Sequence, residues 1–216
     1  MPRAALLVAC AVAATAAIVG GGVLALGTSD SRAPTAPTDA AGPAPFRTTA
    51  LADYDTAGAV VSRGPFCDAV DARQVSAAVG GDPASSSSWQ NGDRIDLGNG
   101  VKDVGHEFGC RYAGVDGTVA QAWVFAPPVG AEEGQQLIKS AGQARGCEAG
   151  AGPPFGSPTL ALTCTTKDGT VRASYRGLFG DAWLVCEVDR PPGATWDAAD
   201  RAGRWCVGVL GAAGTA

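Results

Sequence analysis

The feature that most constrains this chain is an uncharged run of 23 mainly apolar residues, from position 4 to position 26. About 20 such residues cross the hydrocarbon core of a bilayer as a helix whose backbone hydrogen bonds close internally. Arg3 stands before the run, whereas Asp30 and Arg32 follow it. Because basic ends tend to stay in the cytoplasm, this pattern predicts a single membrane pass at residues 4 to 26, with the C-terminal part outside the cytoplasm.

Two alternatives concern the same segment. Val23-Leu24-Ala25 offers small residues of the kind that precede a signal cleavage site, so a secreted protein is the competing interpretation. The length of the run favours an uncleaved anchor. Leu7-Val8-Ala9-Cys10 has the residue types of a bacterial lipidation site, but few apolar residues precede Cys10. We therefore interpret Cys10 as a buried thiol of the membrane helix.

The rest of the chain divides by composition. Residues 27 to 63 are rich in Pro, Ala and Thr and hold few large apolar groups, which predicts a linker behind the membrane segment at 1 to 26. Within it, residues 50 to 61 are more apolar and offer a segment that can pack on a neighbouring domain. Residues 64 to 216 have the usual size of one domain with one core.

Local patterns within 64 to 216 predict three helices. The first follows Asp71 and ends at Gly80-Gly81, the second spans 131 to 145, and the third starts at Thr195. Strands are predicted at 107 to 113, 119 to 126, 159 to 166, 171 to 178 and 182 to 189. The serine-rich stretch 85 to 88 is predicted as loop with at most a short strand. Helices alternating with Asp-Gly hairpins indicate an α+β fold with a mostly antiparallel sheet.

Six cysteines lie in this domain: Cys67, Cys110, Cys147, Cys164, Cys186 and Cys206. An even number in a segment outside the cytoplasm predicts three disulfides. If each bond joins a helix end to a strand, the pairs are Cys67 with Cys110, Cys147 with Cys164, and Cys186 with Cys206. Their spacing does not match a zinc site, so we predict no metal on these thiols.

Catalytic signatures are missing from the sequence. His106 is the sole histidine, and no G-x-S-x-G elbow accompanies it. Glu187 and Asp189 alternate onto one face of a predicted strand and are the best candidates for a glycosidase pair, although a solvated strand face explains them too. Asp93, Asp96, Asn99 and Asp103 crowd a Gly-rich stretch, but their spacing matches no calcium loop. We therefore predict no catalytic residues, no metal and no cofactor.

Charge and aromatic content narrow the possible partners. The chain has a net charge of −5, which argues against nucleic acid and against docking on anionic lipid. Of the five tryptophans, Trp123, Trp183 and Trp196 fit core positions, whereas Trp89 follows four serines. Trp89 is thus the predicted exposed aromatic and the candidate ligand contact.

Short motifs add a resemblance. Phe66-Cys67-Asp68-Ala69-Val70-Asp71 and Gly109-Cys110-Arg111-Tyr112 resemble the small cell-envelope lipoproteins of actinobacteria, a family of unknown function. More loosely, residues 64 to 210 are similar to the extracellular sensor domains of actinobacterial Ser/Thr kinases. The resemblance implies a non-enzymatic binding or sensing module for an unknown envelope ligand or protein. The alternative from the residues is a secreted, carboxylate-dependent hydrolase of wall polymer.

Overall fold

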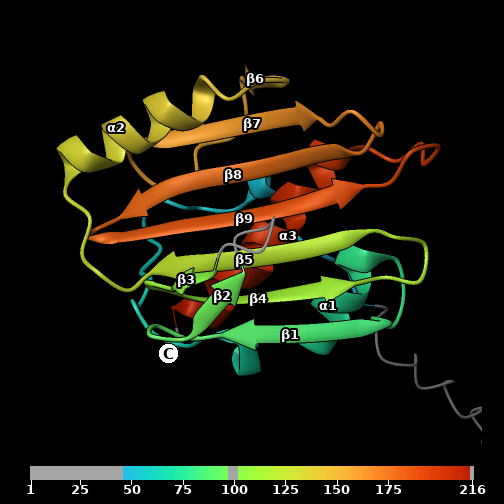
Figure 1. Ribbon diagram of the computed structural model, residues 1–216, viewed down its shortest axis with the longest axis horizontal. Helices are drawn as coiled ribbons and strands as arrows, with labels where there is room; N and C mark the ends of the chain where they lie inside the picture. The colour runs from blue at the N-terminus through green and yellow to red at the C-terminus, as the bar shows by residue number, and fades with distance from the viewer. Residues whose placement is uncertain (1–45, 97–101, 215–216) are drawn as a thin grey trace, which may run out of the picture. The chain divides into compact units, whose positions relative to one another are not determined.

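The computed structural model describes residues 46–96 and 102–214 (Figure 1). They belong to a compact unit that spans Ala44–Ala216. In these residues no helix is long and apolar enough to cross a membrane. The predicted membrane segment at 4 to 26, with Cys10, lies outside the described residues.

A seven-stranded antiparallel sheet forms the centre of the unit, in the spatial order β1-β4-β5-β9-β8-β7-β6 (Figure 1). Its strands are β1 (Ser85–Trp89), β4 (Glu107–Ala113), β5 (Val119–Phe125), β6 (Cys147–Gly150), β7 (Thr159–Thr165), β8 (Val171–Phe179) and β9 (Ala182–Arg190). A separate small hairpin pairs β2 (Arg94–Asp96) with β3 (Lys102–Val104). The described residues thus confirm the predicted α+β class with an antiparallel sheet.

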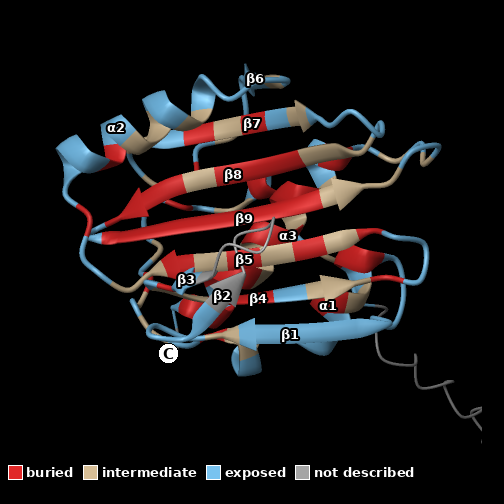
Figure 2. Ribbon diagram, in the orientation of Figure 1, coloured by how far each residue is buried: buried red, intermediate tan, exposed pale blue. Residues whose placement is uncertain are grey.

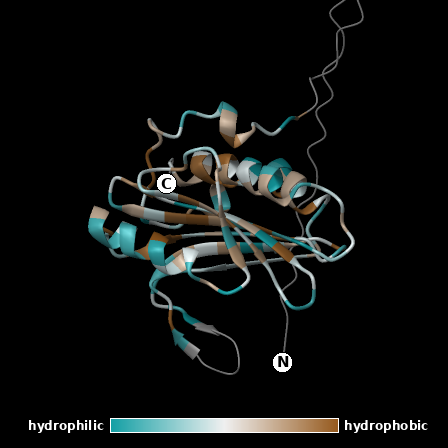
Figure 3. Cartoon of the chain, turned by 90° about the horizontal axis from the view of Figure 1, so that it is seen from above, coloured by the Kyte–Doolittle hydropathy of each residue, from teal (hydrophilic) through white to brown (hydrophobic). Residues whose placement is uncertain are grey.

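Three α-helices cover the two faces of this sheet unequally. Helices α1 (Ala72–Val79) and α3 (Ala198–Ala213) pack on one face, here called the inner face, where α3 lies against β8 and β9. Helix α2 (Ala131–Gly142) lies against β7 and β8 on the outer face. Figure 3, viewed from above, places α3 on one side of the sheet and α2, with the β2–β3 hairpin, on the other.

The helix ends follow local capping rules. The side chain of Asp71 accepts a hydrogen bond from the backbone N–H of Arg73, and Gly80 closes α1 with φ at 82°. Asp197 caps α3 by accepting from the N–H groups of Ala199 and Asp200. Helix α3 therefore starts after Asp197, later than the predicted start at Thr195.

The main core lies between the inner face and the helices α1 and α3. Trp205, Cys206 and Val209 of α3 are almost fully buried there, as are Leu184 and Val188 of β9. Strand β9 is buried along most of its length (Figure 2). Helix α3 packs against it on the inner face, and Trp183 and Val185 on its other face belong to a second buried cluster.

Other parts of the chain also differ from the sequence prediction. Residues 85 to 88 form most of an edge strand, β1, although all four are exposed serines without an apolar pattern. Helix α2 ends at Gly142, before the predicted position 145. Leu51 and Val61, from the predicted linker, are 4% and 7% exposed and belong to the core, so the folded unit starts earlier than position 64.

Two of the three predicted disulfides are present. Cys147–Cys164 joins the paired strands β6 and β7, and Cys186–Cys206 joins β9 to α3. The third predicted bond is absent, because Cys67 and Cys110 are free thiols in this structure. The prediction of three disulfides is therefore corrected to two. Cys67 nevertheless packs against the core cluster that contains Cys110.

Candidate functional site

The outer face of the sheet carries the candidate site, because α2 covers only its β6–β8 side. Side chains alternate across a strand, so the odd-numbered positions of β9, from Trp183 to Asp189, point to the outer face while Cys186 points inward to α3. On the neighbouring strand β5, Trp123 pairs in register with Val185 of β9. These two central strands place aromatic and charged side chains on one surface.

A cavity of about 300 Å³ opens on this face. We call it the outer groove, and it is lined by Trp89, Glu107, Gln121, Trp123, Phe125, Leu137, Arg176, Trp183 and Val185. Trp183 and Val185 are buried and form its floor, whereas Trp123 and Phe125 are half-buried. A cavity of this volume, lined mainly by apolar side chains of which four are aromatic, and by a few polar groups, has the composition of a small-ligand site.

Trp89 closes one side of the outer groove through a specific local arrangement. It pairs with Gly109 of β4, and a Cβ at position 109 would lie 2.3 Å from the Trp89 ring. The indole N–H donates to Glu107 Oε1 at 2.9 Å, while burial raises the pKa of Glu107 against the effect of this bond. Glycine at 109 therefore leaves room for the Trp89 ring, and the acceptor at 107 holds its indole N–H.

A buried carboxylate lies beside the groove. Glu187 is 2% exposed, and its Oε1 accepts a hydrogen bond from the Gln121 side-chain amide, a residue of the groove. Arg172 Nε lies 3.2 Å from the same oxygen, and it donates to Asp189 Oδ1 at 2.7 Å. Burial raises the pKa of Glu187, and the Arg172 charge offsets only part of that rise. One arginine thus binds both carboxylates that the sequence singled out.

Arg176 supplies the groove with a cation that is incompletely paired. Its Nη2 lies 3.9 Å from Glu187 Oε2, beyond hydrogen-bond distance. Its Nε is buried without a hydrogen-bond partner among the described residues. Burial also lowers the pKa of Arg176, although Glu187 opposes this shift. A buried donor without a partner costs about 1 to 3 kcal/mol. The Arg176 side chain as a whole is 24% exposed and lines the groove, where a ligand can contact it.

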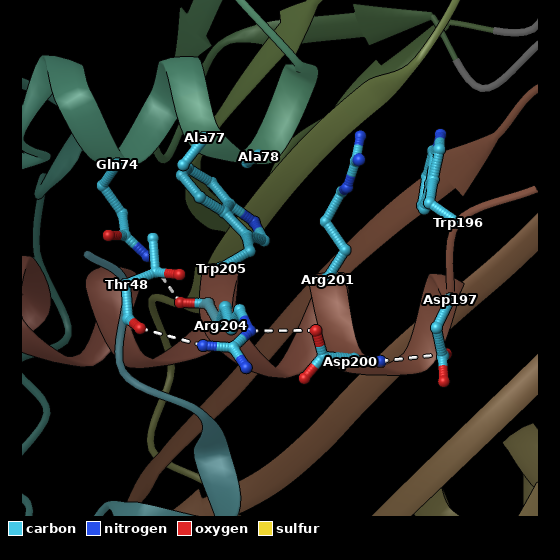
Figure 4. A pocket seen from close by; sticks show the side chains of 10 residues that line it. All are labelled: Thr48, Gln74, Ala77, Ala78, Trp196, Asp197, Asp200, Arg201, Arg204 and Trp205. Atoms are coloured by element: carbon cyan, nitrogen blue, oxygen red, sulfur yellow. Dashed lines mark hydrogen bonds and ion pairs between the residues drawn. The ribbon is translucent and has the colours of Figure 1, made fainter. Parts of the chain in front are cut away.

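A second cavity, of about 140 Å³, lies between α1 and α3 (Figure 4). Its charged groups already have partners: Arg204 donates to Asp200 and to the Thr48 carbonyl, each at 2.9 Å. The guanidinium of Arg201 stacks on the Trp196 ring at 3.7 Å. Because this cavity is small and its polar side chains serve the packing of α3, we assign it a structural role.

The other predicted candidates do not meet at the groove. His106 is exposed, and Asp103 bonds to the neighbouring N–H of Val104. In the described residues no three His, Cys, Asp or Glu side chains are grouped to hold a metal ion, and Asn99 lies outside those residues. Trp89 is half-buried in a strand rather than exposed in a loop.

Trp123 and Arg176 were missed as groove residues. The alternation in β5 and β8 places them on one face each, but which face stays open depends on where α2 packs.

No known protein family matches this chain, and no curated protein is similar to it.

Proposed function

We propose that this protein is a non-enzymatic binding module of the cell envelope, whose ligand site is the outer groove. In this proposal residues 4 to 26 anchor the chain and residues 64 to 216, with the preceding segment that packs on them, face away from the cytoplasm. The observation that carries the proposal is an aromatic-lined cavity of about 300 Å³ beside the buried, partnerless Nε of Arg176.

The groove's chemistry favours an uncharged ring with polar edges, such as one sugar of a wall glycan. Trp89 and Trp123 offer flat apolar surfaces to a ring face. Arg176 offers donors, while Glu107 and Gln121 offer acceptors for hydroxyl and amide groups. The net charge of −5 disfavours a polyanion.

Hydrolysis of wall polymer is the alternative function, and the site supports it less. A glycosidase needs two carboxyl groups that both reach the substrate: one protonates the leaving group, and the other attacks the sugar or activates a water. Here Glu187 is 2% exposed and shares Arg172 with Asp189. Binding without turnover therefore fits this geometry better.

The proposal is tested by titrating the protein with short oligomers of N-acetylglucosamine while tryptophan fluorescence is recorded. We expect saturable binding by the wild-type protein. W123A should weaken it by about tenfold, the effect of losing about 1.4 kcal/mol of ring contact.

The matched control is W196A, because Trp196 belongs to the cavity between α1 and α3 and not to the groove. Equal loss of binding in W196A and W123A would refute the groove as the site. Release of new reducing ends from the oligomers would favour the hydrolase.

A further inference from the structure

Cys67 and Cys110 bring two distant segments together beside the sheet. Cys110 lies in the middle of β4, is 1% exposed and faces the core. Cys67 begins the short 3₁₀ helix η2 (Cys67–Ala69) and packs against the same core, half-buried. The Tyr112 hydroxyl, on β4, donates to the Cys67 carbonyl at 3.4 Å. These contacts hold η2 and its Cys67 against the part of the core that contains Cys110.

The two sulfurs differ in access. Cys67 lines a surface cavity of about 200 Å³ together with Ser88 and Trp89. Cys110 is the register partner of Ser88, but it is not among the residues that line the cavity. A reagent in this cavity therefore contacts Cys67, while Cys110 is covered by the core.

The two thiols also differ in acidity, and the more accessible thiol, Cys67, is the more acidic one. A hydrogen bond from Cys110 lowers the pKa of Cys67, and the same bond, together with burial, raises the pKa of Cys110 far above its usual range. An accessible sulfur that ionises more easily, next to a buried thiol, has the arrangement of an attacking and a resolving cysteine.

We propose that Cys67 and Cys110 form a reactive dithiol site whose substrate is a low-molecular-weight disulfide. The Cys67 thiolate attacks one sulfur of that disulfide, forms a mixed disulfide and releases one thiolate. Cys110 then loses its proton to solvent and attacks the Cys67 sulfur, which releases the second thiolate. The protein gives up two electrons and closes a Cys67–Cys110 bond, and the small disulfide becomes two thiols.

This site differs from the two bonded pairs in its place in the fold. Cys186–Cys206 lies wholly within the core, and Cys147–Cys164 joins two directly paired strands. In neither pair, therefore, is one sulfur accessible while the other is covered by the core. We expect these two pairs to stay bonded under conditions in which Cys67 and Cys110 react.

The test equilibrates the full-length protein, made in an oxidising compartment, in buffers with different ratios of reduced to oxidised glutathione. Free thiols are then alkylated and counted by intact mass, and bonds are located by peptide mapping. We expect Cys67 and Cys110 to change from alkylated to bonded across the range, while the other two pairs stay bonded throughout. A Cys67–Cys110 pair that is alkylated at every ratio, or bonded at every ratio, overturns the proposal.

Two variants test the order of attack. C110A should stop at a glutathione adduct on Cys67, because the resolving thiol is gone. In C67A, the glutathione adduct on Cys110 should form at least about tenfold more slowly than the adduct on Cys67 forms in C110A. The reverse pattern would overturn the assignment of Cys67 as the attacking sulfur. Retention of Cys147–Cys164 and Cys186–Cys206 in each variant shows that the unit has folded.

Discussion

Gly177 is the residue at which the fold tolerates least change. A Cβ at this position in β8 would lie 1.6 Å from the carbonyl oxygen of Phe155, whose side chain is fully buried. The collision involves backbone on both sides, so a rotamer change cannot relieve it. We expect G177A to lower the free energy of unfolding by about 3 kcal/mol or more, measured by denaturant unfolding.

Gly150 provides the matched control for this substitution. It also lies in a strand of the same sheet, β6, but a Cβ there would meet nothing within 4 Å. We expect G150A to stay within about 0.5 kcal/mol of the wild type. A similar loss in both variants would mean that β-strand glycines, rather than the contact with Phe155, account for the effect.

Glu187 should make stability depend on pH. Burial raises its pKa above the value of 4.5 expected in the unfolded chain. The folded state therefore binds this proton more tightly, so the contribution of Glu187 falls as pH rises from below 4.5 through the folded pKa. We expect the free energy of unfolding of the wild type, relative to E187Q, to decrease over this window, measured by denaturant unfolding at a series of pH values.

The E187Q variant lacks the ion pair with Arg172 at every pH, so the test compares how the free energy of unfolding changes with pH and not its absolute value. The curves of the two proteins would be parallel if Glu187 had an unshifted pKa. A relative stability that increases with pH would mean that Arg172 outweighs burial and lowers the pKa.

At the scale of single residues, the sequence predicted on which face a side chain lies better than which side chain it contacts. Alternation along one strand was enough to place Glu187 and Asp189 together on a face. It gave no sign that Arg172 lies between them, because that contact depends on the register of β8 with β9. Likewise Trp89 was selected as a contact, but its hydrogen bond to Glu107 follows from the pairing of β1 with β4.

Among the elements, the two disulfides allow a direct comparison. Cys147–Cys164 and Cys186–Cys206 close loops of similar length, with separations of 17 and 20 residues. The chain-entropy model therefore predicts a similar loss, of about 3 kcal/mol, when either bond is removed. Replacing Cys186 and Cys206 by alanine should cost more than this, since both sulfurs are buried and their removal leaves a core cavity.

Thermal unfolding of the two double-alanine variants measures the difference. The pair at the sheet edge, C147A with C164A, is the control for loop closure without core packing. Equal melting temperatures would show that the core sulfurs add nothing to packing beyond their bond. A lower melting temperature for the edge variant would contradict the assignment of α3 and β9 as the centre of the core.

Elements with strong local signals were predicted well, and those without were missed. Helix α1 and the β4–β5 hairpin have an Asp cap, a left-handed Gly80 and an Asp-Gly turn, all of which act within a few residues. Strand β1 is made of serines and gains its structure from pairing with β4. Pairing partners far along the chain leave no local pattern, so the sequence predicted a loop with at most a short strand here.

For the whole molecule, composition predicted the class of fold but not the open part of the outer face. The order of predicted helices and hairpins indicated an α+β domain. The groove exists because α2 packs toward β6–β8 and leaves the aromatic side chains of β5 uncovered. The direction in which α2 packs is set by tertiary contacts, which a local sequence pattern does not reveal.

The compartment in which the chain folds should decide whether the whole unit is stable. Small domains are stable by about 5 to 15 kcal/mol, and two disulfides of about 3 kcal/mol each form a large part of this. We expect the unit from Ala44 to Ala216, made in a reducing cytoplasm, to lack Cys147–Cys164 and Cys186–Cys206 and to melt cooperatively only at much lower temperature, or to aggregate.

The comparison protein is the same unit, made in an oxidising compartment and shown by intact mass to hold both bonds. A large difference in melting temperature would mean that stable folding requires export, in agreement with an N-terminal segment that directs the chain across a membrane. Equal melting temperatures would mean that the core alone supports the fold. The disulfides would then no longer argue for a location outside the cytoplasm, and the apolar run at 4 to 26 would be the remaining argument for it.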